Sequence, residues 1–125
     1  ASMTATPEFG FILLPVADPG ASAAFYARLL GRPPVEASET FAMIPLREGV
    51  MLGLWKRDGM VPPPGAAPGG SEIAFLVADV DAAHAAWAGL GVAILQAPVA
   101  MDFGRTFTAA DPDGHRLRVF RPGGP

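Results

Sequence analysis

The chain has 125 residues, a formal net charge of −3 at pH 7 and 50% hydrophobic residues, so a disordered chain is excluded and one modest folded core is expected. It contains no cysteine, which excludes disulfides, thiolate nucleophiles and thiolate metal sites. No basic run could neutralise a phosphate backbone and no apolar run approaches about 18 residues, so neither nucleic-acid binding nor a membrane span is expected. Because the sequence also lacks the pattern of a signal peptide, we expect a cytoplasmic protein.

The first part of the chain predicts a strand, a helix and a hairpin in that order. Branched and aromatic residues favour strands, and the Asp18-Pro19-Gly20 turn precedes an alanine-rich segment that stops at Gly31, as a helix does. The expected elements are a strand over 9–16, a helix over 21–30, and two strands over 40–46 and 50–56 joined by the turn at 47–49.

A segment rich in proline and glycine separates this part from a second series of elements. The run VPPPGAAPGG cannot form a helix, and we interpret residues 58–70 as a linker. The elements expected after it are strands over 71–77 and 92–95 with a helix over 81–90 between them, and a hairpin of 105–109 with 115–121.

The two series are copies of one pattern. LLPVADPGASAAFY at 13–26 matches AFLVADVDAAHAAW at 74–87, and REGVMLGLWK at 47–56 matches PDGHRLRVFR at 112–121. A repeat of this length predicts two copies of one βαβββ unit that bury a face against each other. The expected division is a tag remnant with an N-terminal tail at 1–8, a first module at 9–57, the linker at 58–70 and a second module at 71–125.

The βαβββ repeat, the helix end FYARLLG and the terminal DPDGHRLRVF resemble the vicinal oxygen chelate superfamily, which includes glyoxalase I, extradiol dioxygenases, and fosfomycin and bleomycin resistance proteins. The resemblance covers nearly the whole chain. It implies an α+β fold in which paired βαβββ modules form an eight-stranded open cup, with the helices outside and a ligand inside.

The resemblance also locates four positions that carry metal ligands in metal-dependent members, here Phe11, Gly53, Glu72 and Arg118. A divalent ion in such a site prefers imidazole nitrogen or carboxylate oxygen, so only Glu72 qualifies, and an arginine repels the ion. We therefore expect no metal and no cofactor, and a salt bridge between Glu72 and Arg118 instead. Two roles stay open for this pair: a polar anchor for a ligand, or a contact that only closes the vacated site.

Strand alternation places an aromatic, sulfur-bearing and charged set on one face and an aliphatic set on the other. The first composition is typical of a ligand pocket, and the ring of Trp55 suits stacking on a planar aromatic compound. The alternative is that Trp55 only seals the core. The residues that we expect to bind the ligand are Trp55, Phe41, Met43, Met51, Phe103, Arg105, Phe107, Phe120, Glu72 and Arg118.

The strings LGLWK, SEIAF and FGRTFTAADPDGHRLRV are similar to the metal-free antibiotic-binding branch, in particular the phenazine-resistance proteins. This implies a homodimer that sequesters a planar aromatic small molecule and has no catalytic residue. Three alternatives stay open: a metal-dependent lyase or dioxygenase, a metal-free enzyme that uses Glu72 as a general base, and a carrier or sensor of a metabolite.

Overall fold

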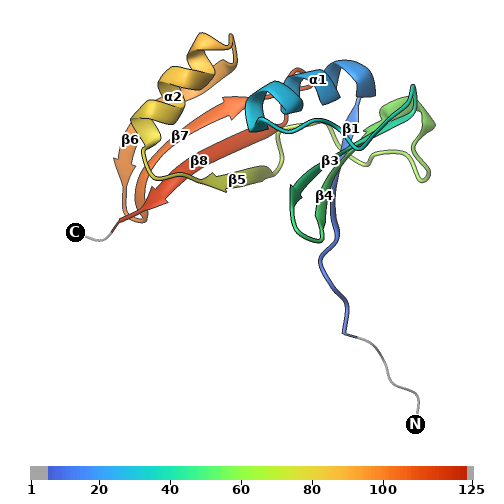
Figure 1. The fold of residues 1–125 in the computed structure, drawn as a ribbon, viewed down its shortest axis with the longest axis horizontal. Helices are drawn as coiled ribbons and strands as arrows, with labels where there is room; N and C mark the ends of the chain where they lie inside the picture. Colours follow the sequence, from blue (N-terminus) through green and yellow to red (C-terminus); the bar gives the residue numbers. More distant parts are fainter. Residues whose placement is uncertain (1–5, 124–125) are drawn as a thin grey trace. The chain divides into compact units, whose positions relative to one another are not determined.

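The computed structural model describes residues 6–123, which form two compact units with their boundary between Met60 and Val61 (Figure 1). Each unit contains one four-stranded sheet and one α-helix. The elements of the first unit are β1 (Phe11–Val16), α1 (Pro19–Leu30), β2 (Glu36–Ala37), β3 (Phe41–Arg47), β4 (Val50–Lys56) and the short 3-10 helix η1 (Arg57–Gly59). Those of the second are β5 (Glu72–Leu76), α2 (Val80–Gly89), β6 (Ala93–Met101), β7 (Gly104–Ala110) and β8 (Arg116–Pro122).

The two sheets have the same topology. Their strand orders are β1-β4-β3-β2 and β5-β8-β7-β6, and in each the first strand pairs with the last in parallel. The predicted α+β fold of two βαβββ modules is therefore confirmed. In residues 6–123, neither helix has the length and apolar character needed to cross a membrane.

Both helices begin at the aspartate that the repeat aligns. Asp18 and Asp79 have nearly the same backbone angles, φ −138° with ψ 100° and φ −137° with ψ 103°. The Asp18 carboxylate accepts hydrogen bonds from the Gly20 and Ala21 amides, and the Asp79 carboxylate accepts one from Ala82. Pro19, expected in a turn, is the first residue of α1, since the first helical position needs no N–H.

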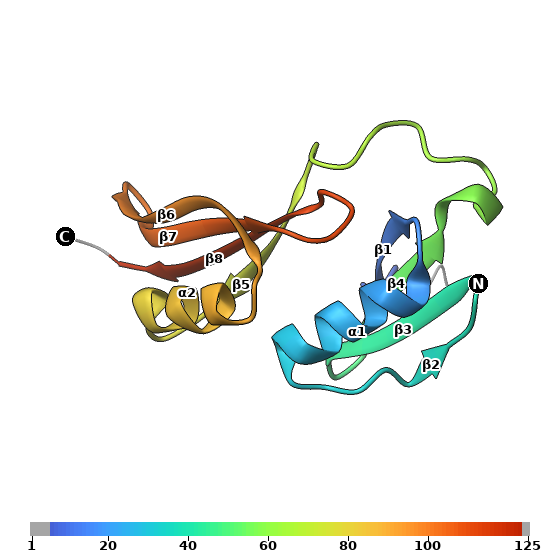
Figure 2. The same cartoon turned by 90° about the horizontal axis from the view of Figure 1, so that it is seen from above.

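The strand registers separate each sheet into two faces. Phe11 lies opposite Met51 and Glu72 lies opposite Arg116, so positions that are equivalent in the repeat are also equivalent in the sheets. One face of each sheet packs under its own helix (Figures 1 and 2), and we call the other the open face. The helix-covered faces hold the buried side chains Leu14, Val16, Ala42, Ile44, Leu52 and Leu54 in the first unit and Ile73, Phe107, Ala109, Leu117 and Val119 in the second.

Strand β6 is longer than the sequence predicts, since it extends to Met101 rather than ending at Leu95. Pro98 suggests a break, because proline cannot donate to a strand ladder. However, β6 lies at the edge of its sheet, and its register with β7 shifts on both sides of Gln96. An irregular edge strand accommodates the proline and continues.

Candidate functional site

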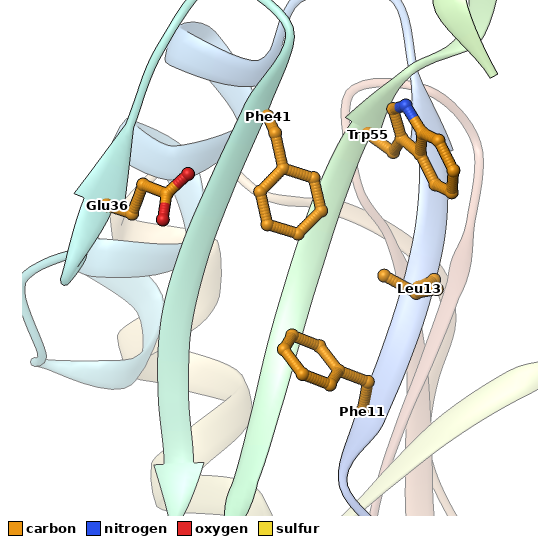
Figure 3. Close-up of a pocket in the computed structure, with 5 residues that line it drawn as sticks. All are labelled: Phe11, Leu13, Glu36, Phe41 and Trp55. Atoms are coloured by element: carbon orange, nitrogen blue, oxygen red, sulfur yellow. The ribbon is translucent and has the colours of Figure 1, made fainter.

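The open face of the first sheet contains an apolar hollow of about 500 Å³ (Figure 3). Four strands contribute to it, and we call it the aromatic hollow. Phe41 and Trp55, neighbours across β3 and β4, meet edge to face with ring centroids 6.4 Å apart and planes at 84°. The lining residues are Phe11 and Leu13 of β1, Glu36 of β2, Phe41 of β3 and Trp55 of β4.

Gly53 forms the floor between these side chains. A Cβ atom at this position would lie 2.5 Å from Cδ2 of Leu13 and 3.0 Å from Cζ of Phe41. Because glycine has no side chain, the side chains of Leu13 and Phe41 can lie close to the backbone of β4 at this position. Phe11 and Leu13 remain 46% and 44% exposed, which is unusual for large apolar side chains that share one patch. The hollow thus presents uncovered apolar surface.

The open face of the second sheet carries a polar group instead, which we call the Arg–Glu–Arg cluster (Glu72, Arg116 and Arg118). Arg118 donates two hydrogen bonds to the Glu72 carboxylate, from Nε to Oε1 at 2.6 Å and from Nη2 to Oε2 at 3.0 Å. Nη2 of Arg116 contacts Oε2 of Glu72 at 2.9 Å. The predicted pairing of Glu72 with Arg118 is confirmed, and the contact of Arg116 with Glu72 adds a member that the predicted pair did not include.

The ion pair between Glu72 and Arg118 shifts the pKa of both groups. The hydrogen bond from Arg118 is the main reason that the pKa of Glu72 lies below its ordinary value, since desolvation opposes this shift and the charges of both arginines add to it. The same hydrogen bond raises the pKa of Arg118. The side chains of Glu72 and Arg118 are only 28% and 20% exposed, so water weakens the pair less than it would a fully exposed one. Glu72 is therefore an ionised carboxylate and a weak base at neutral pH.

Thr106 holds Arg118 from the neighbouring strand. Its hydroxyl donates to the carbonyl oxygen of Val119 at 2.8 Å and accepts from Nη1 of Arg118 at 3.3 Å. Arg118 thus has a partner on β5 and another on β7, which fixes its guanidinium over the sheet.

The four positions that the resemblance equates with metal ligands do not suit a metal. Phe11 and Gly53 offer no donor atom, and Arg118 offers only hydrogen-bond donors and a positive charge. Glu72, the remaining position, already accepts contacts from both arginines. Within residues 6–123, no group of three or more His, Asp or Glu side chains is arranged to hold an ion. These residues therefore do not fit the divalent ion that the fold family implies.

Most of the expected ligand-binding residues lie on the open faces. Phe41 and Trp55 line the aromatic hollow, and Met43 and Met51 lie on the same face of β3 and β4, opposite Gly53 and Phe11. In the second sheet, Glu72, Arg118 and Phe120 share the open face. Phe103 lies in the turn before β7 and places its ring 6.3 Å from that of Phe120.

Phe107 and Arg105, also expected to bind the ligand, do not lie on an open face. Phe107 is fully buried on the helix-covered face, where its ring packs edge-on against Trp87 and His84 of α2. Arg105 shares that side of β7 and makes a bidentate contact with Asp81 of α2, at 2.8 and 2.9 Å. The register, which pairs Thr106 with Phe120, turns Thr106 and Thr108 toward the open face and their neighbours away from it.

Three residues of the site are not among those expected to bind the ligand. Strand parity places Leu13 on the same face as Phe11, and Arg116 on the same face as Arg118, as the registers show. Glu36 belongs to a strand of only two residues, too short to show any alternation, so its sequence contains no comparable signal.

Comparison with known proteins supports the fold. Residues 8–119 match the family described as the Glyoxalase/Bleomycin resistance protein/Dioxygenase superfamily. The chain is 28% identical to the phenazine antibiotic resistance protein EhpR of Enterobacter agglomerans over 125 residues, which cover 95% of this chain and 94% of that protein.

Two solved structures are similar as well. Protein ATC0852 from Agrobacterium tumefaciens is 48% identical with a TM-score of 0.85, covering 95% of this chain and all of that one. A glyoxalase-related enzyme from Fulvimarina pelagi is 24% identical with a TM-score of 0.81, over 93% of this chain and 88% of that one, which shows a shared fold.

Replacing Glu72 by alanine should lower the free energy of unfolding by about 1–2 kcal/mol at pH 7, because two guanidinium groups lose their carboxylate. Since folding lowers the pKa of Glu72, its contribution is complete above the ordinary carboxyl value of about 4.3 and is lost as the pH falls through the folded value. Urea unfolding of wild type and Glu72→Ala between pH 7 and 2.5 measures this. Glu39→Ala, at an exposed position before β3, should change the free energy by less than about 0.5 kcal/mol. A wild-type advantage that persists unchanged at pH 2.5 would contradict the assignment.

Protein purified without a chelator should contain no stoichiometric zinc, nickel, manganese or iron, because at most one of the four positions can ligate. Elemental analysis by mass spectrometry tests this, with Glu72→Ala as the matched control. An ion bound by Glu72 and at least two other side chains would overturn the conclusion that the donor set does not fit.

Proposed function

This chain belongs to the glyoxalase/bleomycin resistance protein/dioxygenase superfamily, and on that basis we propose that it binds a planar aromatic, antibiotic-like compound of the phenazine type and sequesters it without conversion and without a metal. The observation that carries the proposal is the aromatic hollow. Three aromatic rings and one leucine surround a space of about 500 Å³, which lies within the usual range of about 300–1,000 Å³ for ligand pockets.

The chemistry of the hollow supports a flat apolar guest. Its single titratable lining residue is Glu36, at the edge of the sheet, and the other four side chains are apolar. Aromatic rings gain from stacking or edge-to-face contact with a planar polycycle in addition to the area they bury. The likeness to a phenazine antibiotic resistance protein across nearly the full length of both chains agrees with this ligand class.

Sequestration is favoured over turnover by the state of Glu72, the residue that a metal-free enzyme of this fold would use as base. A general base works best when its pKa is near the operating pH, whereas the hydrogen bond from Arg118 lowers the pKa of Glu72 and so moves it further below neutral pH. Incubation of a bound compound with and without added divalent metal separates the two functions, since a binding protein returns the compound unchanged in both cases.

We also propose that the chain acts as a homodimer. β1 and β5 are the outer strands of their sheets, and each carries exposed apolar side chains on its open face, Phe11 and Leu13 on the first and Leu76 on the second. Such strands are commonly covered by another chain. Light scattering coupled to size-exclusion chromatography should give about twice the chain mass of 12.9 kDa. A mass of one chain at micromolar concentration would contradict this.

Replacing Trp55 by alanine should weaken binding of a phenazine by about 1–3 kcal/mol, the range measured for bases stacked on aromatic side chains. Calorimetric titration measures the affinity, and quenching of tryptophan fluorescence reports contact. Trp87 belongs to α2 and is buried against Phe107 of the second sheet, so Trp87→Phe should retain most of the quenching.

Trp55→Ala should keep the fold, because the ring lines a hollow rather than the helix-covered core. Expression of the wild type should protect phenazine-treated cells, which a metabolite carrier would not do, and expression of Trp55→Ala should not protect them. If Trp55→Ala unfolds the protein and the wild type binds no planar aromatic compound, Trp55 is a core residue and the proposal fails.

A further inference from the structure

The open face of the second sheet has one more positive than negative charge. Glu72 supplies one carboxylate, while Arg116 and Arg118 each supply a permanently charged guanidinium. In residues 72–122, the strand registers place no other charged side chain of β5 to β8 on this face. Asp111 lies beyond the end of β7, and its carboxylate accepts from the amides of Asp113 and His115. Among the side chains of β5 to β8, this face therefore carries one more positive than negative charge.

Two donors on this face also lack an acceptor. Among the residues that the structure describes, neither Nε of Arg116 nor the hydroxyl of Thr108 has a hydrogen-bond partner, although both atoms are buried. Thr108 as a whole is only 1% exposed. A buried donor left unpaired costs free energy, so such groups usually have a partner or a function that requires them.

The two donors lie close enough to serve one ligand group. Thr108 is directly opposite Arg118 in the antiparallel pair, which makes Arg116 its diagonal neighbour. Diagonal positions in a sheet are about 7–8 Å apart, within reach of an arginine side chain. Arg116 is held by fewer contacts than Arg118, because its side chain is 40% exposed and contacts Glu72 through one nitrogen, whereas Arg118 uses two.

An apolar surface lies beside this polar region on the same face. Phe120 follows Arg118 by two residues, about 7 Å along the strand, next to Leu76 and within 6.3 Å of the ring of Phe103. A flat ring placed on Phe120 would bring a substituent to the arginines. A carboxylate suits that position, since it carries one negative charge and accepts several hydrogen bonds in one plane.

We propose that Arg116, Arg118 and Thr108 bind a carboxylate on the open face of the second sheet, so that this face takes planar aromatic acids whose ring lies on Phe120. This rests on the proposed binding of planar aromatic compounds and narrows their class, and it concerns the second unit by itself. In this arrangement Arg118 keeps its two hydrogen bonds to Glu72, and Arg116 and Thr108 donate hydrogen bonds to the ligand carboxylate. The opposing possibility, that the cluster only stabilises the sheet, is an outcome of the test.

The experiment compares two probes of the same shape, phenazine-1-carboxylate and the neutral phenazine-1-carboxamide, by calorimetric titration at pH 7 and about 0.15 M salt. The wild type should bind the acid at least about tenfold more tightly, as expected for a hydrogen-bonded charge. Arg116→Gln should remove this preference and leave the affinity for the carboxamide unchanged. Arg121→Gln is the matched control, because it removes the same charge from the other side of β8, where Arg121 bonds the Ala78 carbonyl.

Thr108→Val provides a second variant that should fold, since the hydroxyl it removes makes no hydrogen bond. It should weaken binding of the acid by about fivefold and leave the carboxamide unaffected. Equal affinity of the wild type for both probes would overturn the subsite and leave sequestration standing. An equal loss of preference in Arg121→Gln would also overturn it, because the effect would then be one of net charge. If neither probe binds, the proposed function fails, and the subsite fails with it.

Discussion

The structure depends on one constraint, the alternation of side chains between the two faces of each four-stranded sheet. In both units the helix covers one face, so the residues of that parity must be apolar and buried, as Leu52, Leu54, Leu117 and Val119 are. The other parity is free of this requirement. It can therefore differ between the two copies of the repeat without loss of the fold, and the differences there determine what each open face can bind.

Much of the fold could be predicted because these constraints are local. The aligned Asp18 and Asp79 fix where the helices begin, and the repeat transfers the register of one module to the other, so that Phe11 pairs with Met51 as Glu72 pairs with Arg116. The contact between Glu72 and Arg118 was predicted from the metal-ligand positions that the family resemblance locates, and the structure contains it. Element ends were less predictable where sheet position decides them, as at Pro98, which an edge strand tolerates and a central strand would not.

The site could be predicted only in part, because β7 shows no clear alternation of its own. In the sequence RTFTAA, the aromatic residue suggests a pocket and the threonines suggest solvent. The pairing with β8 reverses this, since Thr106 lies opposite Phe120 while Phe107 lies under α2. Such an inversion is possible because the Thr106 hydroxyl finds an acceptor in the carbonyl of Val119. A single strand cannot reveal a bond that another strand supplies.

The two open faces show that two copies of one sheet can carry different side chains at equivalent positions. Equivalent positions hold Phe11, Met51, Gly53 and Trp55 in the first module and Glu72, Arg116, Arg118 and Phe120 in the second. A metal centre would need similar donor atoms from both modules, whereas here one module has only apolar groups at these positions and the other joins its carboxylate to two cations. The ion pair also makes Glu72 a poor base, because the hydrogen bond from Arg118 lowers its pKa. The first open face is therefore apolar and aromatic, and the second carries charge without a strong base.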